Sequence, residues 1–335
     1  MSEHSYRRAV TPGGFLVTGG QKECRMRHFD TLNRLSAHDL EDILRLAACI
    51  KERWQRGDRP RLLAQRMMTL VFEKPSLRTR VSFEAAVAQL GGSSLFLTCA
   101  EAGLNGREST ADVARVLSTY SDWIVTRTFS HRLVDEFVKY AGCPVINGLS
   151  DQGHPCQALS DLLSMREALE SLAGKTVAFV GDGNNVARSL ARATTLLGMK
   201  FVLAAPAGYE LPADYVAQLK QSCSTAEIMQ TADPREAVAR ADVVYTDVWA
   251  SMGQEAEQEN RKQVFAPYQV NAALMAAAPK SARFMHCLPA RRNMEVTDEV
   301  LDGKQSIALA QAENRLHGAR GILLWLSGID ANAAP

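Results

Sequence analysis

The chain has 335 residues, with 38 Lys and Arg against 37 Asp and Glu, so its formal net charge is +1. This length predicts about two domains, and the balanced charge argues against broad binding to nucleic acid or to an anionic membrane, so we expect neither as a partner. Hydrophobic residues make up 46% of the chain, which excludes wholesale disorder, and no apolar run reaches the roughly 18 residues that cross a bilayer.

Residues 1–27 are polar and lack the apolar core of a secretory signal, so we expect an N-terminal extension there. Residues 28–150 then alternate between helical and strand patterns. Ser36 can cap a first helix that runs to about Arg56, with apolar residues at helical spacing. Strands are predicted over 67–72, 94–98, 123–127 and 144–147, and helices over 79–90, 110–120 and 131–140.

A second unit over residues 151–304 repeats this rhythm after a long helix from Pro155 to about Leu172. Strands are predicted over 176–180, 200–204, 243–247 and 283–286, and helices over 185–197, 234–241 and 305–326. The alternation predicts an α/β fold with two doubly wound domains, each a mainly parallel sheet flanked by helices, joined by interdomain helices. We place a hinge near 148–155 and expect ligands beyond the carboxyl ends of the strands.

The seven cysteines are odd in number, widely spaced and without a Cys-x-x-Cys pair. This pattern disfavours a disulfide framework or a zinc ribbon. We therefore expect reduced thiols and a cytoplasmic protein.

Two polar clusters fall where a helix begins. FEKPSLRTR (residues 72–80) follows the first strand, and the Ser76 and Thr79 hydroxyls, the Arg78 guanidinium and backbone N–H groups could surround a phosphate. A capped helix with solvated arginines is the alternative. In HPCQ, His154 and Gln157 can face one site or simply cap the long helix. No second ligand pair accompanies the His and Cys of this motif, so we reject a zinc site.

Later clusters follow strands of the second unit. GDGNN (residues 181–185) resembles a dinucleotide fingerprint, but Val186 replaces the third glycine, so a nicotinamide site is weakly supported and we expect no cofactor. Asp247 ends a strand and could hold an ammonium group, and Ser251 could bond a small polar ligand or only cap a loop. Cys287 has arginines close by, which would lower the pKa of its thiol, although a buried structural cysteine is the common alternative. By itself, Arg315 indicates only a salt bridge.

The order of these motifs resembles the aspartate/ornithine carbamoyltransferase family. The resemblance runs from about Arg27 to Leu326 and rests on FEKPSLRTR, RES at 107–109, HPCQ, GDGNN, DVWASMGQE, HCLP and AENR. It implies an enzyme of arginine metabolism that transfers the carbamoyl group of carbamoyl phosphate to the δ-amine of L-ornithine, giving citrulline and phosphate. It also implies a homo-oligomer, commonly a trimer, in which 28–150 binds carbamoyl phosphate, 151–304 binds ornithine, and the helix within 305–335 packs back on the first domain.

The resemblance also assigns site residues. The carbamoyl phosphate contacts are Ser76, Leu77, Arg78, Thr79, Arg127, His154, Gln157, Cys287, Leu288 and Arg315, and the ornithine contacts are Asn185, Asp247, Ser251 and Met252. Arg127, His154, Asp247 and Cys287 form the catalytic subset, and no metal is expected. The chemistry agrees, because three arginines can neutralise a dianion, and each donor aimed at the oxyanion is worth ~3 kcal/mol.

Two features depart from the typical pattern. Ala290-Arg291-Arg292-Asn293 follows HCLP and is similar to relatives that carbamoylate N-acetylornithine or N-succinylornithine, so an acylated acceptor is the alternative. Ser251-Met252-Gly253 resembles the corresponding triplet of the enzymes that use free ornithine. We give this triplet more weight because it would contact the amino-acid end of the substrate directly. The loop at 103–106 lacks the Gln or His with which many relatives reach a neighbouring subunit.

Overall fold

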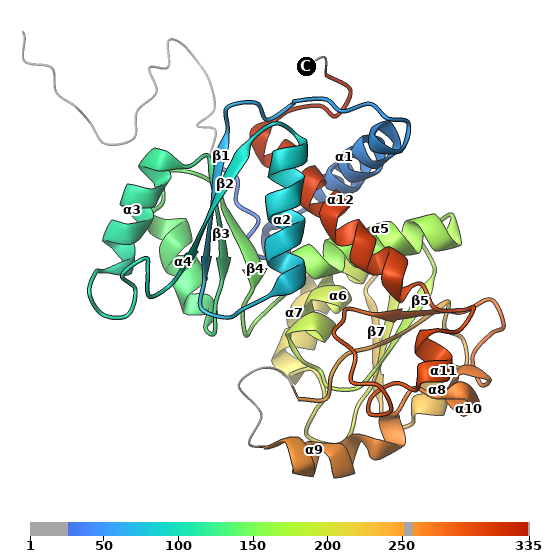
Figure 1. Cartoon of the computed structure of the whole chain (residues 1–335). Helices are drawn as coiled ribbons and strands as arrows, with labels where there is room; N and C mark the ends of the chain where they lie inside the picture. Colours follow the sequence, from blue (N-terminus) through green and yellow to red (C-terminus); the bar gives the residue numbers. More distant parts are fainter. Residues whose placement is uncertain (1–25, 251–256, 334–335) are drawn as a thin grey trace, which may run out of the picture.

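The computed structural model describes residues 26–250 and 257–333, and these form two parallel β-sheets flanked by helices (Figure 1). The strand order is β2-β1-β3-β4 in the first sheet and β7-β6-β5-β8-β9 in the second. Every pairing between neighbouring strands is parallel. The predicted fold class, a doubly wound α/β arrangement in two units, is therefore confirmed.

The first sheet and its helices follow the predicted pattern closely. The elements are η1 (Leu32–Arg34), α1 (Ala37–Gln55), β1 (Met67–Phe72), α2 (Leu77–Gln89), β2 (Ser93–Thr98), α3 (Thr110–Tyr120), β3 (Trp123–Arg127), α4 (His131–Tyr140) and β4 (Val145–Leu149). A capping box at Ser36 starts α1 as expected. Helix α2 starts at Leu77, two residues before the predicted start, because the Ser76 hydroxyl accepts a hydrogen bond from the Thr79 N–H and caps it.

The second sheet contains elements that the sequence pattern did not predict. Its elements are α5 (Pro155–Leu169), β5 (Thr176–Val180), α6 (Asn185–Leu196), β6 (Lys200–Ala204), α7 (Ala213–Ser222), β7 (Glu227–Thr231), α8 (Pro234–Val238), β8 (Val243–Thr246), α9 (Gln258–Phe265), η3 (Ala266–Tyr268), α10 (Ala272–Met275), β9 (Arg283–His286), α11 (Asp298–Leu301) and α12 (Ala308–Ser327). Strand β7 was not predicted because it lies at the sheet edge, where Ile228 is its one buried residue. Its short apolar pattern gives little strand signal.

Apolar side chains cover both faces of each sheet. On one face of the first sheet, Val71 and Ile124 pack with residues of α3 and α4, whereas Leu70 and Val125 pack toward α2 on the other. The cluster on the α2 side continues without interruption into α5, α6 and one face of the second sheet. A common core therefore joins the two sheets.

The last long helix, α12, packs against α1, α2 and α5 (Figure 1). Two glycines permit this close approach. A Cβ at Gly318 would lie 2.5 Å from the Ser160 hydroxyl on α5, and a Cβ at Gly321 would lie 2.7 Å from the Ile43 carbonyl oxygen on α1. This packing holds the part of α12 that carries Arg315 against α5. Among the described helices, none is both long and apolar enough to span a membrane.

Candidate active site

A cavity of about 400 Å³ opens beyond the carboxyl ends of the strands of both sheets. This volume lies in the range of small-molecule sites, roughly 300–1,000 Å³. The segments after β1 and β3 face it from the first sheet, and those after β5 and β8 from the second. In each sheet, the chain order reverses between these two strands, which is where doubly wound sheets bind ligands.

The cavity brings together every predicted site residue that the structure describes. Its lining includes Ser76, Leu77, Arg78, Thr79, Arg127, His154, Gln157, Asn185, Asp247, Cys287, Leu288 and Arg315. Ser251 and Met252 lie outside the described residues. Lys74 and Arg291 also line the cavity and were not predicted.

The start of α2 forms one wall of the cavity. Its first N–H groups have no partner within the helix, and the positive end of the helix faces the cleft. Leu77, the first residue of α2, is largely exposed to solvent. Together with the Ser76 cap, this turn has the geometry of an anion site.

Three guanidinium groups crowd the same wall without a carboxylate ion pair to any described residue. Arg127 and Arg315 are buried and both donate to the Thr79 hydroxyl, over 3.3 and 3.5 Å. Arg78 makes no hydrogen bond or ion pair within the described part of the chain, and the buried Arg127 Nε has no hydrogen-bond partner. Burial, together with the positive charges of Arg315 and Arg78, lowers the pKa of Arg127 to about 10. Such crowding is costly unless an anion occupies the cleft.

His154 faces this cluster as a neutral ring. Burial, with the nearby charges of Arg315, Arg127 and Arg78, lowers its pKa well below the ordinary value. Its Nε2 lies 3.5 Å from an Arg315 nitrogen that can only donate, which assigns the proton to Nδ1. Nδ1 is buried, and its N–H has no hydrogen-bond partner among the described residues.

Asp247 and Cys287 connect the ends of β8 and β9. The Cys287 thiol donates to Asp247 Oδ1 over 2.9 Å, and the Asn184 amide donates to Asp247 Oδ2 over 3.0 Å. Burial and the Asp247 charge raise the pKa of Cys287 well above its ordinary value. The expectation of a lowered thiol pKa was therefore wrong, because burial and the neighbouring Asp247 carboxylate outweigh the positive charge of Arg78. Cys287 is a protonated donor rather than a nucleophile.

The paired asparagines of GDGNN divide their roles. Asn184 caps α6 with its side-chain oxygen and orients Asp247 with its amide nitrogen. Asn185 donates to the Ser150 carbonyl oxygen over 2.6 Å and so ties the cleft to the segment before α5. The sequence analysis did not predict a role for Asn184. Its position as the helix cap directly before Asn185 was the sequence feature that could have indicated one.

Asp247, His286 and Cys287 place possible metal-ligand atoms within 4.8 Å of one another. Both ring nitrogens of His286 already have protein partners, Glu295 at Nε2 over 3.2 Å and the Leu288 N–H at Nδ1 over 2.9 Å. The Cys287 sulfur is bonded to Asp247. The cluster is thus explained by hydrogen bonds, and a metal-free site remains a prediction.

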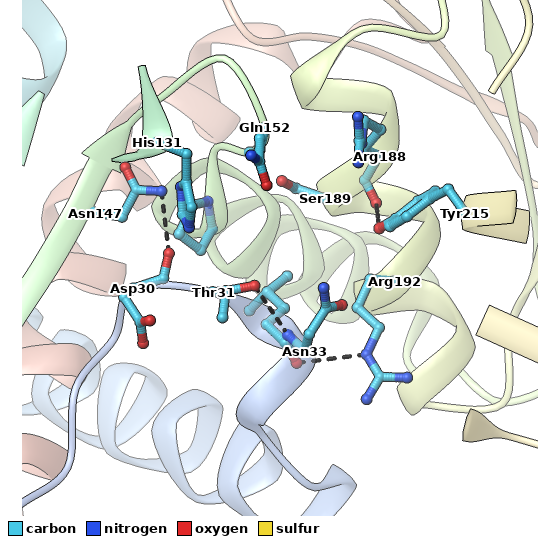
Figure 2. A pocket seen from close by; sticks show the side chains of 13 residues that line it. Asp30, Thr31, Asn33, His131, Asn147, Gln152, Arg188, Ser189, Arg192 and Tyr215 are labelled. Atoms are coloured by element: carbon cyan, nitrogen blue, oxygen red, sulfur yellow. Dashed lines mark hydrogen bonds between the residues drawn. The ribbon is translucent and has the colours of Figure 1, made fainter. Parts of the chain in front are cut away.

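A second, much smaller pocket of about 40 Å³ lies between the N-terminal segment, α6 and α7 (Figure 2). Gly153 and Pro155 line it, whereas the intervening His154 lines the large cleft. Its Arg192 donates to the Leu32 carbonyl oxygen and to the Ser222 hydroxyl. Of the predicted site residues that the structure describes, none lines this pocket.

The fold and the cleft together define a class: an α/β protein with two parallel sheets and an arginine-rich anion site between them. The family model for the carbamoyl-P binding domain of aspartate/ornithine carbamoyltransferase matches residues 27–167. The model for the Asp/Orn binding domain matches residues 173–326. The chain belongs to the aspartate/ornithine carbamoyltransferase family.

Similar proteins agree with this assignment. The ornithine carbamoyltransferase of Anoxybacillus flavithermus is 49% identical over 302 residues, covering 90% of this chain and 96% of the relative. The solved ornithine carbamoyltransferase of Pyrococcus furiosus has a TM-score of 0.87 and 44% identity, covering 92% of this chain and 98% of that one. The anabolic enzyme of Campylobacter jejuni has a TM-score of 0.84 and 33% identity, covering 90% and 99%.

Proposed function

We propose that the cleft transfers the carbamoyl group of carbamoyl phosphate to the δ-amine of L-ornithine, giving L-citrulline and phosphate (EC 2.1.3.3). The observation that carries this function is a cluster of three arginines, Arg78, Arg127 and Arg315, that gathers with the neutral His154 near the start of α2. None of the three arginines forms an ion pair with a carboxylate of the described residues. A phosphate dianion supplies the missing negative charge. The family and the ornithine carbamoyltransferase relatives support the acceptor.

On the donor side, Arg78, the α2 N–H groups, Ser76 and Thr79 bind the phosphate. The carbonyl oxygen of the carbamoyl group then faces Arg127 and the His154 Nδ1–H. Gln157 and the Leu288 segment hold the amide end. Because Arg127 and the His154 N–H are fixed in place before the reaction, each stabilises the negative charge that develops on this oxygen by ~3 kcal/mol.

On the acceptor side, Asp247 binds an ammonium group of ornithine, and Asn185, Ser251 and Met252 complete the amino-acid contacts. The uncharged δ-amine attacks the carbonyl carbon and a new C–N bond forms. The C–O bond to phosphate then breaks, and the nitrogen proton leaves with the departing phosphate. The Cys287 S–H, held by Asp247, orients the attacking amine. Holding both substrates together supplies much of the rate.

The position of the two arginines after HCLP favours an acceptor with one carboxylate, such as ornithine, over N-succinylornithine, which has two. Arg292 is drawn away from the cleft, because it pairs with Asp302 over 2.6 and 2.9 Å and also with Asp298. Only Arg291 lines the cavity. One cation near the acceptor is compatible with a single amino-acid carboxylate.

We assign residues 28–150 to carbamoyl phosphate and 151–304 to ornithine, with the helix within 305–335 returning to the first domain. We also assign a cytoplasmic homotrimer acting in arginine biosynthesis. The edge strand β2 exposes Leu95, and the adjacent α2 exposes Leu77 and Val81. Apolar side chains at an open sheet edge favour a covering subunit. Light scattering during size exclusion tests this: a mass of three chains is expected, and a monomeric mass contradicts it.

A product assay tests the activity. The protein is incubated with carbamoyl phosphate and either L-ornithine, N-acetylornithine or N-succinylornithine, and the ureido product is identified by mass spectrometry. We expect citrulline from free ornithine. A product from an acylated substrate alone would overturn the acceptor assignment, and no product from any of them would overturn the function.

A further inference from the structure

Asp161 is a fully buried carboxylate behind the cleft that the chemistry described above does not use. It lies on α5, one turn after Gln157, and its side chain is 0% exposed. Its Oδ1 accepts hydrogen bonds from Gln157 Nε2 over 2.8 Å and from Gln311 Nε2 over 2.7 Å. Its Oδ2 accepts from the Tyr245 hydroxyl over 3.0 Å. Three donors from three elements therefore converge on one carboxylate.

The carboxylate determines which way the Gln157 amide points. An ionised carboxylate can only accept, so the amide must present Nε2 to Asp161. Its Oε1 then faces the opposite way and accepts a hydrogen bond from Arg315 Nη1. The reversed amide would place an N–H group against a guanidinium that can only donate. Asp161 and Arg315 thus fix the amide from both sides.

The same carboxylate also reaches the acceptor side. Tyr245 lies on β8, two residues before Asp247, so its hydrogen bond anchors the strand that carries the acceptor-binding carboxylate. Gln311 on α12 accepts from the His286 N–H over 2.9 Å, directly before Cys287. Movement of Asp161 would therefore disturb both walls of the cleft.

We propose that Asp161 is a positioning residue for carbamoyl transfer: it orients the Gln157 amide so that the amide oxygen faces Arg315 and the carbamoyl group of the bound substrate. This role rests on the proposed function. Asp161 touches no substrate itself, because it does not line the cleft. Its loss should affect recognition of the carbamoyl group more than recognition of the phosphate, which Arg78 and the start of α2 bind.

Asp161→Asn tests the role with little change of shape. The asparagine amide can turn, so it no longer forces Gln157 into one orientation. We expect the affinity for carbamoyl phosphate, relative to inorganic phosphate, to fall at least about tenfold by calorimetry, with a similar loss of kcat. An unchanged ratio and kcat would overturn the proposal.

Ser164→Ala is the matched control. Ser164 lies about one turn further along α5, is also buried, and accepts a hydrogen bond from Asn314 of α12 over 3.0 Å. Its removal breaks an α5–α12 hydrogen bond without touching Gln157 or Arg315. We expect an unchanged affinity ratio. An equal fall in this control would mean that loosened helix packing, rather than orientation of the amide, is responsible, and would overturn the proposal.

Tyr245→Phe keeps the proposal testable if Asp161→Asn does not fold. It removes one of the three donors to Asp161, so the affinity ratio should fall about twofold to threefold. An unchanged ratio in this variant would also contradict the role. Failure of the proposed function is distinguishable, because the wild-type protein would then make no citrulline.

Discussion

The large cleft and the small pocket of Figure 2 both contain buried arginines, but the arginines have different surroundings. In the small pocket, Arg192 donates to a backbone carbonyl oxygen and to a serine hydroxyl of the protein. In the cleft, Arg78 has no hydrogen-bond or ion-pair partner among the described residues, and Arg127 has one weak contact to Thr79 and a buried Nε without a partner.

This difference indicates what each arginine is for. A guanidinium whose donors are satisfied by the protein holds elements together, whereas one left unsatisfied in a cavity awaits a ligand. The cleft arginines also lower each other's pKa, as in Arg127. The positive charges of these arginines therefore repel one another in the cleft, and a bound dianion would relieve this repulsion.

Arg78→Ala should have the largest effect on activity. It removes a charge-assisted contact to the phosphate, so kcat/KM for carbamoyl phosphate should fall by about 10²-fold or more. The melting temperature should not fall, because one of three mutually repelling charges is gone. Steady-state kinetics and calorimetric unfolding check both outcomes. Normal affinity for carbamoyl phosphate would refute the assignment of the phosphate site.

Arg192→Ala should give the opposite result. It removes hydrogen bonds between α6, η1 and the end of α7, so the free energy of unfolding should fall by about 1–3 kcal/mol. KM for carbamoyl phosphate should stay within about twofold, because Arg192 does not line the cleft. Denaturant unfolding and steady-state kinetics provide the comparison with Arg78→Ala. A large rise in KM without loss of stability would break the distinction between the two regions.

The neutral His154 predicts a pH dependence of stability. Its folded pKa lies well below 6.5, so below pH 6.5 the unfolded chain binds a proton that the folded chain does not. The free energy of unfolding should therefore fall as the pH falls below about 6.5. His317, whose pKa is lowered to about 3 by burial and by Arg320, contributes in the same direction.

The His154 contribution is isolated by comparing the wild type with His154→Asn between pH 5 and 8. The loss of stability toward low pH should be smaller in the variant, because of the two histidines with a lowered pKa only His317 is still present. Identical pH profiles would show that His154 is not held neutral by the arginine cluster.

The adjacent pair Arg291 and Arg292 should give the smallest and most local effects. Arg291 lines the cleft near the acceptor, whereas Arg292 is exposed and paired with Asp298 and Asp302. Arg291→Ala should raise KM for ornithine by about threefold to tenfold. Arg292→Ala should leave this KM unchanged, because Arg292 does not line the cleft. Equal KM values in the two variants would contradict a role for Arg291 in acceptor binding.

Much of the fold could be predicted because its signals are local. The strands at 67–72, 123–127, 176–180 and 200–204 matched the prediction to the residue, since buried parallel strands are short continuous apolar runs. The missed elements include α7 and β7, which carry partly exposed faces with weak periodicity. The predicted site residues that the structure describes converged on one cleft, because a doubly wound fold places the ends of its strands together.

The sequence by itself determined the elements, the family and the chemical types of the cleft residues, because caps, periodicity and motifs depend on neighbouring positions. Only the tertiary structure decided that Cys287 is a protonated thiol and that Asn184 orients Asp247. It also decided that Asp161 turns the Gln157 amide toward Arg315, a residue 158 positions away. The reason is physical: the pKa of a buried group and the direction of a buried amide depend on charges and donors that folding brings from distant parts of the chain.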